Sequence, residues 1–407
     1  MLLARMLGGV ITKGRVTFID PAGRAHDLGC DDGRPPVVMR VRDRLTELRL
    51  VLHPYAYAGE AYMDGGLVIE QGSLADWMAI CYENFERAAA SSRFRRVRNW
   101  LHRALRPITQ YNPVGRARRH VAHHYDLSDA LFDQFLDKDR QYSCAYFATP
   151  NHNLDQAQDA KKRHIAAKLL LEPGMKVLDI GSGWGGLALY LARTANVDVT
   201  GVTLSVEQQQ FAERRARDAG LADRVRFHLR DYRLEPGRYD RVVSVGMFEH
   251  VGARHFGEFF RKLGELMNAD GVALLHSIGR FDGPGATNTW LRKYIFPGGY
   301  TPALSEVAAA VERSGLVTTD IEILRLHYAE TIKAWQRRFA LNRDAVKAMY
   351  DERFCRMWEF YLTATEMAFR YGGQMVFQMQ LAHRLDAVPL TRDYVVDWER
   401  EHALVSA

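Results

Sequence analysis

Cysteine is scarce in this chain, and the few cysteines present exclude several classes of protein. Cys30, Cys81, Cys144 and Cys355 lie far apart, and no two of them form a C-x-x-C pair. This spacing argues against a disulfide framework and against a cysteine-rich zinc site, and it is typical of a reducing compartment. The sequence also lacks an H-E-x-x-H motif, so we expect no metal site.

Long apolar runs are missing as well. No stretch of 18 apolar residues occurs, so we expect no membrane-spanning helix. The N-terminal sequence MLLARMLGGVITKG contains a short apolar run that is broken by Arg5, and no small-residue cleavage pattern follows it. It indicates mature protein rather than a signal peptide. Together with the cysteine pattern, this predicts a cytoplasmic protein.

The composition is that of an ordinary folded protein, with 407 residues, 47% apolar and 26% charged. This length is sufficient for two domains with separate cores. Residues 1 to about 90 mix short alternating segments with one helical pattern, which predicts a small α+β domain. We place its boundary near residue 115, which gives an N-terminal domain at 1–115 and a second domain at 116–407. The arginine-rich end of the N-terminal domain, with apolar residues at helical spacing between the arginines, favours association with a lipid or membrane surface.

Apolar strand-like runs alternate with helical stretches from about residue 120. The runs are KVLDIG, VDVTGVTLS, VRFHLRD, YDRVVSVGM and GVALLHSIG. Such alternation predicts an α/β domain of Rossmann-like type, with a parallel sheet that helices cover on both faces. Two late segments, TTDIEILR and QMVFQMQLAHR, are candidates for strands that complete the sheet.

A glycine-rich loop follows the first of these strands, in the sequence VLDIGSGWGG at 177–186. In an open α/β sheet, ligands bind beyond the carboxyl ends of the strands, and glycines there let the backbone approach the ligand. A P-loop is excluded because no Lys-Ser/Thr pair follows the glycines. A nicotinamide site would place an acid at the end of the second strand, where this chain has Thr203 and Ser205.

The acid lies instead at Asp179, within the first strand and just before the loop. A carboxylate at this position suits a cationic ligand, and the pattern Asp-x-Gly-x-Gly-x-Gly favours S-adenosylmethionine. The alternative is that Asp179 and the glycines only make a tight turn from strand to helix. Further along, Asp231 and Tyr232 follow the third strand, where they could meet and stack on an adenine.

The second strand is followed by GVTLSVEQ, whose polar side chains have two interpretations. Thr203, Ser205 and Gln208 could bind the ligand through hydrogen bonds. Alternatively, Ser205 is a good N-cap for a helix starting at Val206, with Gln208 at the reciprocal position of a capping box. The pattern alone leaves both open.

Nine arginines, but no lysine and no acid, occur between Arg93 and Arg119. Within RFRRVRNWLHRALRP, apolar residues recur at helical spacing between the arginines, as in an amphipathic helix at an anionic membrane surface. The alternative is a helix between domains with a solvated basic face. No nucleic-acid reader motif accompanies the arginines, so we expect no nucleic-acid partner.

Seven ordered blocks resemble those of one family. HHYDLSDALFDQFLD, YSCAYF, VLDIGSGWGG, GVTLSVEQ, MFEHVG, LLHSIG and YIFPGGYTP are together similar to the cyclopropane-fatty-acyl-phospholipid synthases and the related mycolic acid cyclopropane synthases. The resemblance runs from about His123 to His383, and GEAYMDGGL extends it weakly into the N-terminal domain.

The resemblance implies an S-adenosylmethionine-dependent enzyme that adds a methylene across a cis double bond of a phospholipid acyl chain. It also implies a bound bicarbonate as general base, a peripheral position on the inner face of the cell membrane, and a homodimer. The implied bicarbonate ligands are the side chains of Cys144, Glu249, His276 and Tyr328 and the backbone of Ile278. The implied cofactor-binding residues are Tyr142, Ser143, Gly181, Gly183, Gly185, Thr203, Leu204, Gln208 and Asp231, and the patterns described above add Asp179 and Tyr232.

The chemistry of the reaction suits these residue types. Closing the ring requires loss of a proton, and therefore a base that does not itself trap the carbocation. His276 and Tyr328 can donate to a bicarbonate, and Glu249 can take its proton. Judged singly, these residues also have structural interpretations: Cys144 as a small buried apolar residue, His276 as a core histidine with its hydrogen bonds satisfied, and Glu249 as an acid at a helix N-terminus.

One departure from the family pattern concerns a cysteine that many members carry in a late helix. The matching position in FYLTATEMAF is Thr365, and Cys355 lies ten residues away. A covalent cysteine mechanism at that position is therefore ruled out, whereas a bicarbonate mechanism is unaffected. Product geometry is left open, since the same methyl transfer could end in a methyl- or methylene-bearing chain. A small-molecule methyltransferase and a non-catalytic lipid-binding protein are the alternatives from other classes.

Overall fold

The structure is a computed structural model that describes residues 1–90 and 128–403. The chain forms two compact units. The first contains the described N-terminal residues together with Thr287–Pro297 and Ile332–Gly373, and the second contains the remaining described residues. The predicted boundary near residue 115 lies outside the described residues, and so does the arginine-rich segment 93–119. No helix in the described ranges is long and apolar enough to cross a membrane.

The first unit contains a four-stranded sheet with the order β2-β1-β3-β4. The strand β1 is antiparallel to β2 and parallel to β3, and β4 is antiparallel to β3. Alternate residues of β1 and β3 are buried in the core of this unit, as expected for strands with one covered face. The elements are α1 (Leu2–Gly8), β1 (Val16–Ile19), β2 (Ala25–Leu28), β3 (Val37–Val41), α2 (Arg44–Leu52), α3 (Pro54–Met63), β4 (Leu67–Gln71), α4 (Leu74–Ala90), α12 (Thr289–Tyr294), α15 (Arg343–Met349) and α16 (Glu352–Arg370).

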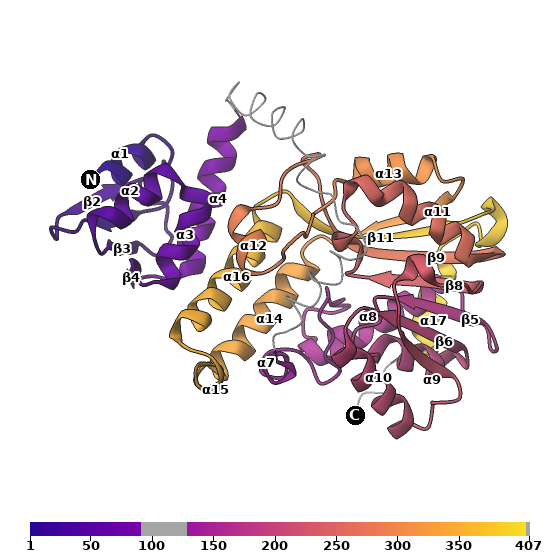
Figure 1. Cartoon of the computed structure of the whole chain (residues 1–407). Coiled ribbons are helices and arrows are strands. Elements are labelled where there is room, and N and C mark those ends of the chain that lie inside the picture. Colours follow the sequence, from indigo (N-terminus) through magenta and orange to yellow (C-terminus); the bar gives the residue numbers. More distant parts are fainter. Residues whose placement is uncertain (91–127, 404–407) are drawn as a thin grey trace. The chain divides into compact units, whose positions relative to one another are not determined.

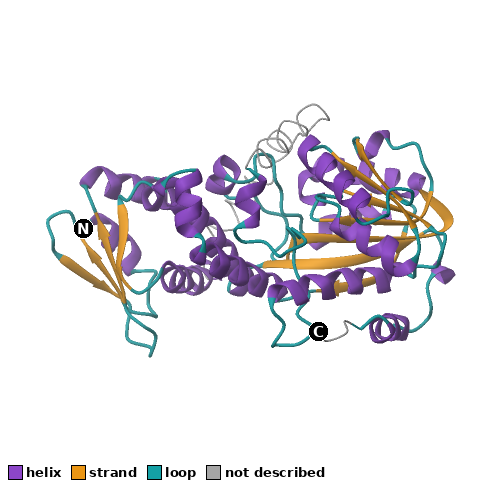
Figure 2. Cartoon of the chain, turned by 90° about the horizontal axis from the view of Figure 1, so that it is seen from below, coloured by secondary structure: helices purple, strands orange, loops and turns teal. Residues whose placement is uncertain are grey.

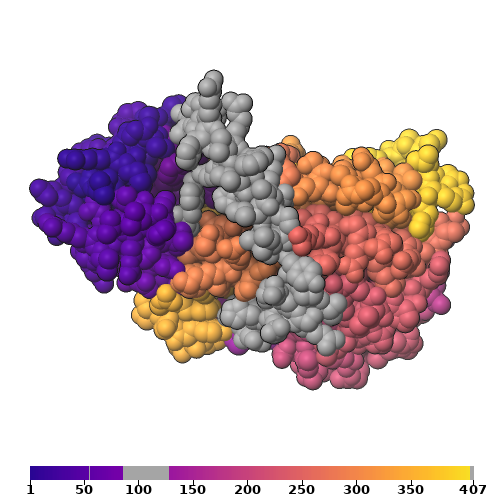
Figure 3. All heavy atoms as spheres, turned by 45° about the horizontal axis from the view of Figure 1, so that its top comes forward, coloured from indigo at the N-terminus to yellow at the C-terminus, as the bar shows by residue number. Residues whose placement is uncertain are grey.

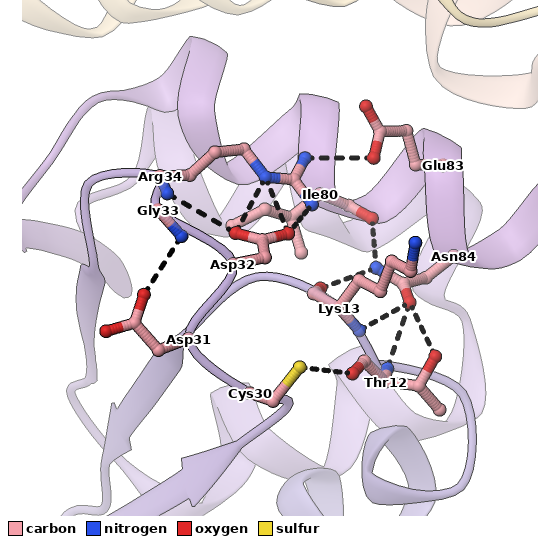
Figure 4. A network of polar contacts seen from close by, with 10 residues as sticks. All are labelled: Thr12, Lys13, Cys30, Asp31, Asp32, Gly33, Arg34, Ile80, Glu83 and Asn84. Carbon is pink, nitrogen blue, oxygen red and sulfur yellow. Dashed lines mark hydrogen bonds and ion pairs between the residues drawn. The ribbon is translucent and has the colours of Figure 1, made fainter.

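A polar network fixes the loop after α1 onto α4 (Figure 4). The amide oxygen of Asn84, a residue only 1% exposed, accepts from the backbone N–H groups of Thr12 (2.9 Å) and Lys13 (3.1 Å). Its amide nitrogen donates to the carbonyl of Lys13 at 2.8 Å. Nearby, Arg34 donates to Glu83 of the same helix at 2.9 Å. The buried amide is thus satisfied on both sides, which a folded core requires.

The second unit contains a seven-stranded sheet with the order β10-β11-β9-β8-β5-β6-β7 (Figure 1). All neighbouring pairs are parallel except those of β11, which is antiparallel to both β9 and β10. The predicted α/β fold is confirmed, and both late strand candidates lie in the sheet. The strands are β5 (Lys176–Ile180), β6 (Asp198–Thr203), β7 (Val225–Leu229), β8 (Tyr239–Val245), β9 (Met267–Arg280), β10 (Val317–Ile323) and β11 (Gln374–Ala382).

Helices cover both faces of this sheet, as Figures 1 and 2 show. One apolar cluster joins the strands to α11 and α13, and a second joins the opposite face to α8, α9 and α10. The helical segments of the unit are α7 (Asp129–Asp133), α8 (Leu154–Leu169), α9 (Gly186–Ala195), α10 (Val206–Asp218), α11 (Phe256–Leu266), α13 (Leu304–Glu312) and α17 (Asp393–Glu401), with short 3₁₀ turns η1 (Tyr232–Leu234), η2 (Phe248–His250), η3 (Ala253–His255) and η4 (Leu385–Ala387). The helix α14 (His327–Leu341) is divided between the two units.

Segments that are distant in the sequence lie side by side on the second unit. The residues just after β11 lie against the end of α11 and the start of β9, and in Figure 3 yellow atoms accordingly adjoin salmon ones. There, the imidazole of His383 bonds to the carbonyl of Gly264 at 3.1 Å, and Arg384 donates to Asp270 at 2.9 Å. The residues that follow β11 are therefore held to α11 and β9.

The helix α8 is unusual because charged and amide side chains are buried along it. It begins at a capping box formed by Asn153 and Gln156. Lys161 is fully buried and Lys168 is 1% exposed. Lysines are almost never so buried without partners, and each of these donates to several oxygens described below. The helix therefore contributes polar groups, as well as apolar ones, to the interior of the unit.

Candidate functional site

The glycine loop joins β5 to α9 at the carboxyl edge of the sheet. Gly185 has φ +82° and forms the N-cap of α9. A Cβ at this residue would lie 2.7 Å from the ring of Phe227 and 2.9 Å from Ala212, so no side chain fits. At Gly183, φ is +54° and nothing lies within 4 Å of such a Cβ. Gly185 is therefore needed for packing, whereas Gly183 leaves the backbone open to a ligand.

A cavity lies above this loop and brings the predicted cofactor residues together. Ten of the eleven predicted residues line it: Tyr142, Ser143, Asp179, Gly181, Gly183, Thr203, Leu204, Gln208, Asp231 and Tyr232. The eleventh, Gly185, is not among the lining residues. Sequence reasoning missed several others, which are Arg140, Gln141, Arg230, Met247 and His250. Met247 and His250 flank the predicted Glu249 in the sequence, so the MFEHVG block pointed to them.

Asp179 gives the cavity an acid suited to a cation. Its side chain is buried, and its Oδ2 atom has no hydrogen-bond partner among the described residues. Burial raises the pKa of Asp179 to about 7, although the nearby positive charge of Lys161 works in the opposite direction. An ammonium or sulfonium group near this carboxylate would give the Oδ2 atom a partner and would offset the cost of burying the negative charge. The residues present thus fit S-adenosylmethionine.

The loop that carries Tyr142 and Ser143 is held by α8. Lys161 donates to the hydroxyl of Ser143 at 2.8 Å and to the amide oxygen of Gln141 at 2.6 Å. Gln158 donates to the backbone carbonyls of Ser143 (3.0 Å) and Gln141 (3.1 Å). Burial lowers the pKa of Lys161 to about 8. Because the buried side chains of Lys161 and Gln158 both bind this loop, the side of the cavity that the loop forms is preorganised. Charged residues on a helix normally lie in solvent, so the sequence does not reveal this role of Lys161.

The segment after β6 contains the predicted helix cap and also contributes side chains to the cavity lining; hydrogen bonds from these side chains to a ligand stay a prediction. Ser205 caps α10 by accepting from the backbone N–H of Gln208 at 3.2 Å. The hydroxyl of Thr203 donates to the side-chain oxygen of Gln208 at 3.0 Å. Thr203 and Gln208 also line the cavity, whereas Ser205 does not. Capping therefore orients the same side chains that face the ligand space.

Asp231 and Tyr232 line the part of the cavity that follows the end of β7. Arg233 donates to both carboxylate oxygens of Asp231, at 2.9 and 2.7 Å. Tyr232 packs edge-on against Phe259, with the ring centroids 5.4 Å apart. Both side chains are thus fixed before any ligand binds. Their contact with an adenine stays a prediction.

The predicted bicarbonate ligands lie beside the cavity rather than in its lining. Glu249, in η2, accepts from the backbone N–H of Ile278 at 2.6 Å through Oε1. Its Oε2 atom is buried and has no hydrogen-bond partner within the described ranges, and burial raises its pKa to about 7. The structure therefore brings together two of the five predicted groups directly. Glu249 is not simply an acid at a helix N-terminus, because the 3₁₀ turn it occupies has only three residues.

His276 and Cys144 are both buried. The Nδ1 atom of His276 lies 3.1 Å from the amide nitrogen of Gln378, and its Nε2 atom has no hydrogen-bond partner among the residues described. It is therefore not a core histidine with both nitrogens satisfied. Burial, with help from Lys161 and Lys168, lowers the pKa of His276 to about 3, so the imidazole is neutral at physiological pH. Burial also raises the pKa of the Cys144 thiol, so this cysteine is not a thiolate nucleophile.

Tyr328 lies near the segment that carries Cys144. The backbone N–H of Ala145 donates to the hydroxyl of Thr331 at 3.0 Å. Thr331 is three residues beyond Tyr328 on α14, and Tyr328 is 7% exposed. Thr365, which replaces the family cysteine, donates its hydroxyl to the carbonyl of Tyr361 at 2.7 Å, within its own helix. Within the two described ranges, no group of three or more potential ligands is arranged to hold a metal ion.

The sheet order, the glycine loop and the cavity beyond it define the fold of an S-adenosylmethionine-dependent methyltransferase. A solved structure of the mycolic acid cyclopropane synthase CmaA1, complexed with SAH and CTAB, matches with a TM-score of 0.62 at 32% identity, covering 67% of this chain and 99% of that one. The family model for mycolic acid cyclopropane synthetase matches residues 114–379. The chain therefore belongs to this family.

Two relatives show how far the similarity extends. The chain is 36% identical over 366 residues to a probable fatty acid methyltransferase of Pseudomonas putida, covering 86% of this chain and 87% of that protein. It is 42% identical over 256 residues to the cyclopropane-fatty-acyl-phospholipid synthase of Escherichia coli strain K12, covering 63% and 65%. The match to the first relative therefore covers more of this chain than the family model does, and both names describe enzymes that modify fatty acyl chains.

Proposed function

We propose that this protein transfers a methyl group from S-adenosylmethionine to the cis double bond of an unsaturated phospholipid acyl chain and closes it to a cyclopropane ring, with bicarbonate as general base. The main support is a pair of buried polar atoms beside the cofactor cavity, Glu249 Oε2 and His276 Nε2, which have no partners among the described residues. Buried polar groups normally find partners, so this pair suits a small polar ligand. The 42% identity to the Escherichia coli synthase supports the same reaction.

The residues of the chain have distinct roles in this proposal. When bound, S-adenosylmethionine supplies the methyl group and bicarbonate supplies a base that does not itself capture the cation. Asp179 would hold the positive end of the cofactor, and the loop at Tyr142 and Ser143, anchored by α8, would help to position it for methyl transfer. His276, which is neutral, donates from Nε2 to the anion.

Glu249 is suited to holding a proton from the same anion. With its pKa raised to about 7, both its protonated and its ionised forms are populated at neutral pH. His276, Cys144 and the Oε2 atom of Glu249 are buried, which excludes water that would otherwise compete for the cationic centre that methyl transfer creates on the acyl chain.

The substrate requires access to a membrane, and we propose that the arginine-rich segment 93–119 provides it. That segment lies outside the described residues, so its sequence pattern alone supports docking on an anionic surface. Peripheral attachment to the inner face of the membrane, a cytoplasmic location and a homodimer belong to the same proposal.

In a second candidate function, the same methyl transfer gives a methyl- or methylene-bearing acyl chain instead of a cyclopropane ring. It is favoured by the similarity to the probable fatty acid methyltransferase, which covers 86% of this chain. The two candidates share the cofactor cavity and differ only in the fate of the cationic centre.

Mass spectrometry of lipids separates these functions. Vesicles with cis-unsaturated chains are incubated with the protein and S-adenosylmethionine, and vesicles with fully saturated chains serve as the matched control. We expect a gain of about 14 Da on the unsaturated chains only, in a product that resists hydrogenation. A product with this mass that takes up hydrogen would support the second candidate. No mass gain despite demonstrated cofactor binding would overturn both and indicate a small-molecule acceptor.

A further inference from the structure

A row of polar side chains crosses three strands of the second unit next to the candidate site. In the antiparallel register, Gln378 of β11 lies directly opposite His276 of β9 on one side and Glu322 of β10 on the other. Gln378 is fully buried and His276 is 2% exposed. On this face of the sheet, α8 places the ammonium of Lys168 against the row. The mechanism described above uses only His276 of this set.

The hydrogen bonds along the row have a definite direction. Lys168 donates to the amide oxygen of Gln378 at 2.8 Å and also to a carboxylate oxygen of Glu322. The amide nitrogen of Gln378 lies 3.1 Å from Nδ1 of His276. An ammonium has three donors and no acceptor, so it must face the oxygen of the Gln378 amide rather than the nitrogen. Lys168 thereby determines which way the amide of Gln378 points.

This orientation determines where the proton of His276 lies. The amide nitrogen of Gln378 is a donor, so Nδ1 of His276 must accept, and a neutral imidazole that accepts at Nδ1 carries its proton at Nε2. In the other tautomer, the N–H at Nδ1 would face the donor of Gln378. If the side-chain amide of Gln378 turned over to accept from that N–H, its NH₂ group would instead face the ammonium of Lys168. Either arrangement loses a buried hydrogen bond and places two donors together.

The charge of Lys168 is itself held in place by an ion cluster. Both ring nitrogens of His164 bond to carboxylates, Nε2 to Glu322 and Nδ1 to Glu399 of α17, each at 2.7 Å. The carboxylates of Glu399 and Glu322 therefore lie on either side of His164, and Glu322 also accepts from Lys168. Burial lowers the pKa of Lys168, and the carboxylate of Glu322 offsets part of this effect. The cluster thus keeps a donor at Lys168.

We propose that Gln378 and Lys168 are positioning residues that lock His276 in the Nε2–H tautomer, so that it presents an N–H to the bicarbonate. The contact of that N–H with bicarbonate rests on the proposed function, whereas the assignment of the tautomer rests only on the hydrogen bonds described above. Neither residue contacts the cofactor cavity, since neither is among its lining residues. The pair acts only through His276.

The test measures the tautomer directly, by NMR of protein in which histidine is labelled with ¹⁵N. The signals of His276 are identified as those missing from His276→Asn. The wild-type protein should show the Nε2–H form. In Gln378→Glu, a carboxylate that Lys168 can still bind would face Nδ1 and accept from it, so His276 should change to the Nδ1–H form.

Gln380→Glu is the matched control. Gln380 lies two residues further along the same strand and is 1% exposed, but it donates to the carbonyl of Lys168 and to Tyr394 rather than to His276. This variant adds the same charge to the same face of the strand and should leave the tautomer unchanged. Should Gln378→Glu fail to give a folded spectrum, Lys168→Met tests the same lock, because a freed Gln378 amide should yield a mixture of both tautomers.

Turnover then separates the two proposals. In Gln378→Glu, we expect kcat to fall at least about tenfold and the KM for added bicarbonate to rise, with unchanged cofactor affinity, because one buried hydrogen bond to the anion is lost. An Nε2–H signal that persists in both Gln378→Glu and Lys168→Met would overturn the tautomer lock. A change of tautomer without any change in turnover would instead leave the lock intact and overturn the assignment of His276 to the bicarbonate site.

Discussion

Glu249→Gln should abolish most turnover and at the same time stabilise the protein at high pH. The glutamine is isosteric: its oxygen can keep the bond to the N–H of Ile278, which is 2.6 Å in the native protein. It cannot hold or release a proton. General acid–base groups contribute about 10²- to 10⁴-fold, so kcat should fall by a factor in this range, about 3–5 kcal/mol of barrier. Cofactor affinity should not change, since Glu249 does not line the cavity.

The effect on stability follows from the raised pKa. Burial raises the pKa of Glu249 from 4.5 to about 7, so at about 1.36 kcal/mol per pKa unit the ionised carboxylate costs the folded protein about 3 kcal/mol. Because the folded protein binds the proton more tightly than the unfolded chain, this cost is absent below pH 4.5, grows between about 4.5 and 7, and is complete above. Glu249→Gln avoids it. The variant should therefore unfold at a higher temperature than the wild type at pH 8 and at the same temperature near pH 4.5.

The assay combines lipid mass spectrometry, cofactor titration and thermal unfolding at the two pH values. Glu235→Gln supplies a control of opposite sign, because the carboxylate of Glu235 is paired with Arg230 (2.8 Å) and with the hydroxyl of Tyr239 (2.9 Å). Its removal should lower stability at pH 8. Wild-type turnover in Glu249→Gln would refute its role as a proton carrier. Lower stability of that variant at pH 8 would show that its carboxylate has a partner that the structure does not contain.

Three further predictions concern the cofactor cavity and the thiols. Asp179→Asn should weaken binding of S-adenosylhomocysteine by at least about tenfold in calorimetry, because a buried charge partner of the ligand's ammonium is lost; unchanged affinity would count against this assignment. Gly185→Ala should destabilise the protein by about 1–3 kcal/mol in thermal unfolding, since its Cβ would lie 2.7 Å from Phe227 at a φ of +82°, and a stability equal to the wild type would contradict the packing argument. Brief alkylation of the native protein should modify the exposed Cys30 and spare the buried Cys144, leaving turnover intact; peptide mass spectrometry and the lipid assay check both points.

The sequence predicted the sheet of the second unit well because its strands are continuous apolar runs. The loop at 177–186 and the polar groups after the next two strands follow from one rule, that parallel strands present their carboxyl ends on the same edge. Eight of the ten predicted cofactor residues that line the cavity lie at or after these strand ends, whereas Tyr142 and Ser143 were predicted from the family resemblance alone. The first unit could not be predicted in this way, because it is built from separate stretches of the chain. Its helices at 289–294, 343–349 and 352–370 come from sequence far beyond residue 115. No local pattern indicates such a return of the chain.

The network behind His276 could not be predicted from the sequence. Gln378 lies 102 residues beyond His276, and their contact depends on the register of an antiparallel pair. Gln378 and Gln380 alternate with apolar residues, which is the pattern of a strand with one face in water. In the structure, α8 covers that face and both glutamines are buried. Lys168 is similar, since a lysine on a polar helix normally lies in solvent.

The place of β11 in the sheet has a consequence for the order in which the protein is made. This strand is the last in the sequence, but it lies between β9 and β10 rather than at an edge. During synthesis, the residues up to the end of β9 emerge before β10 and β11, and they include the glycine loop and the residues that line the cofactor cavity. Until about residue 382 has emerged, β9 and β10 each lack a neighbour, and His276 lacks Gln378. A nascent chain could therefore bind cofactor well before its proton-transfer groups are in order, and it exposes two unpaired strand edges that invite misassembly until the final strand inserts.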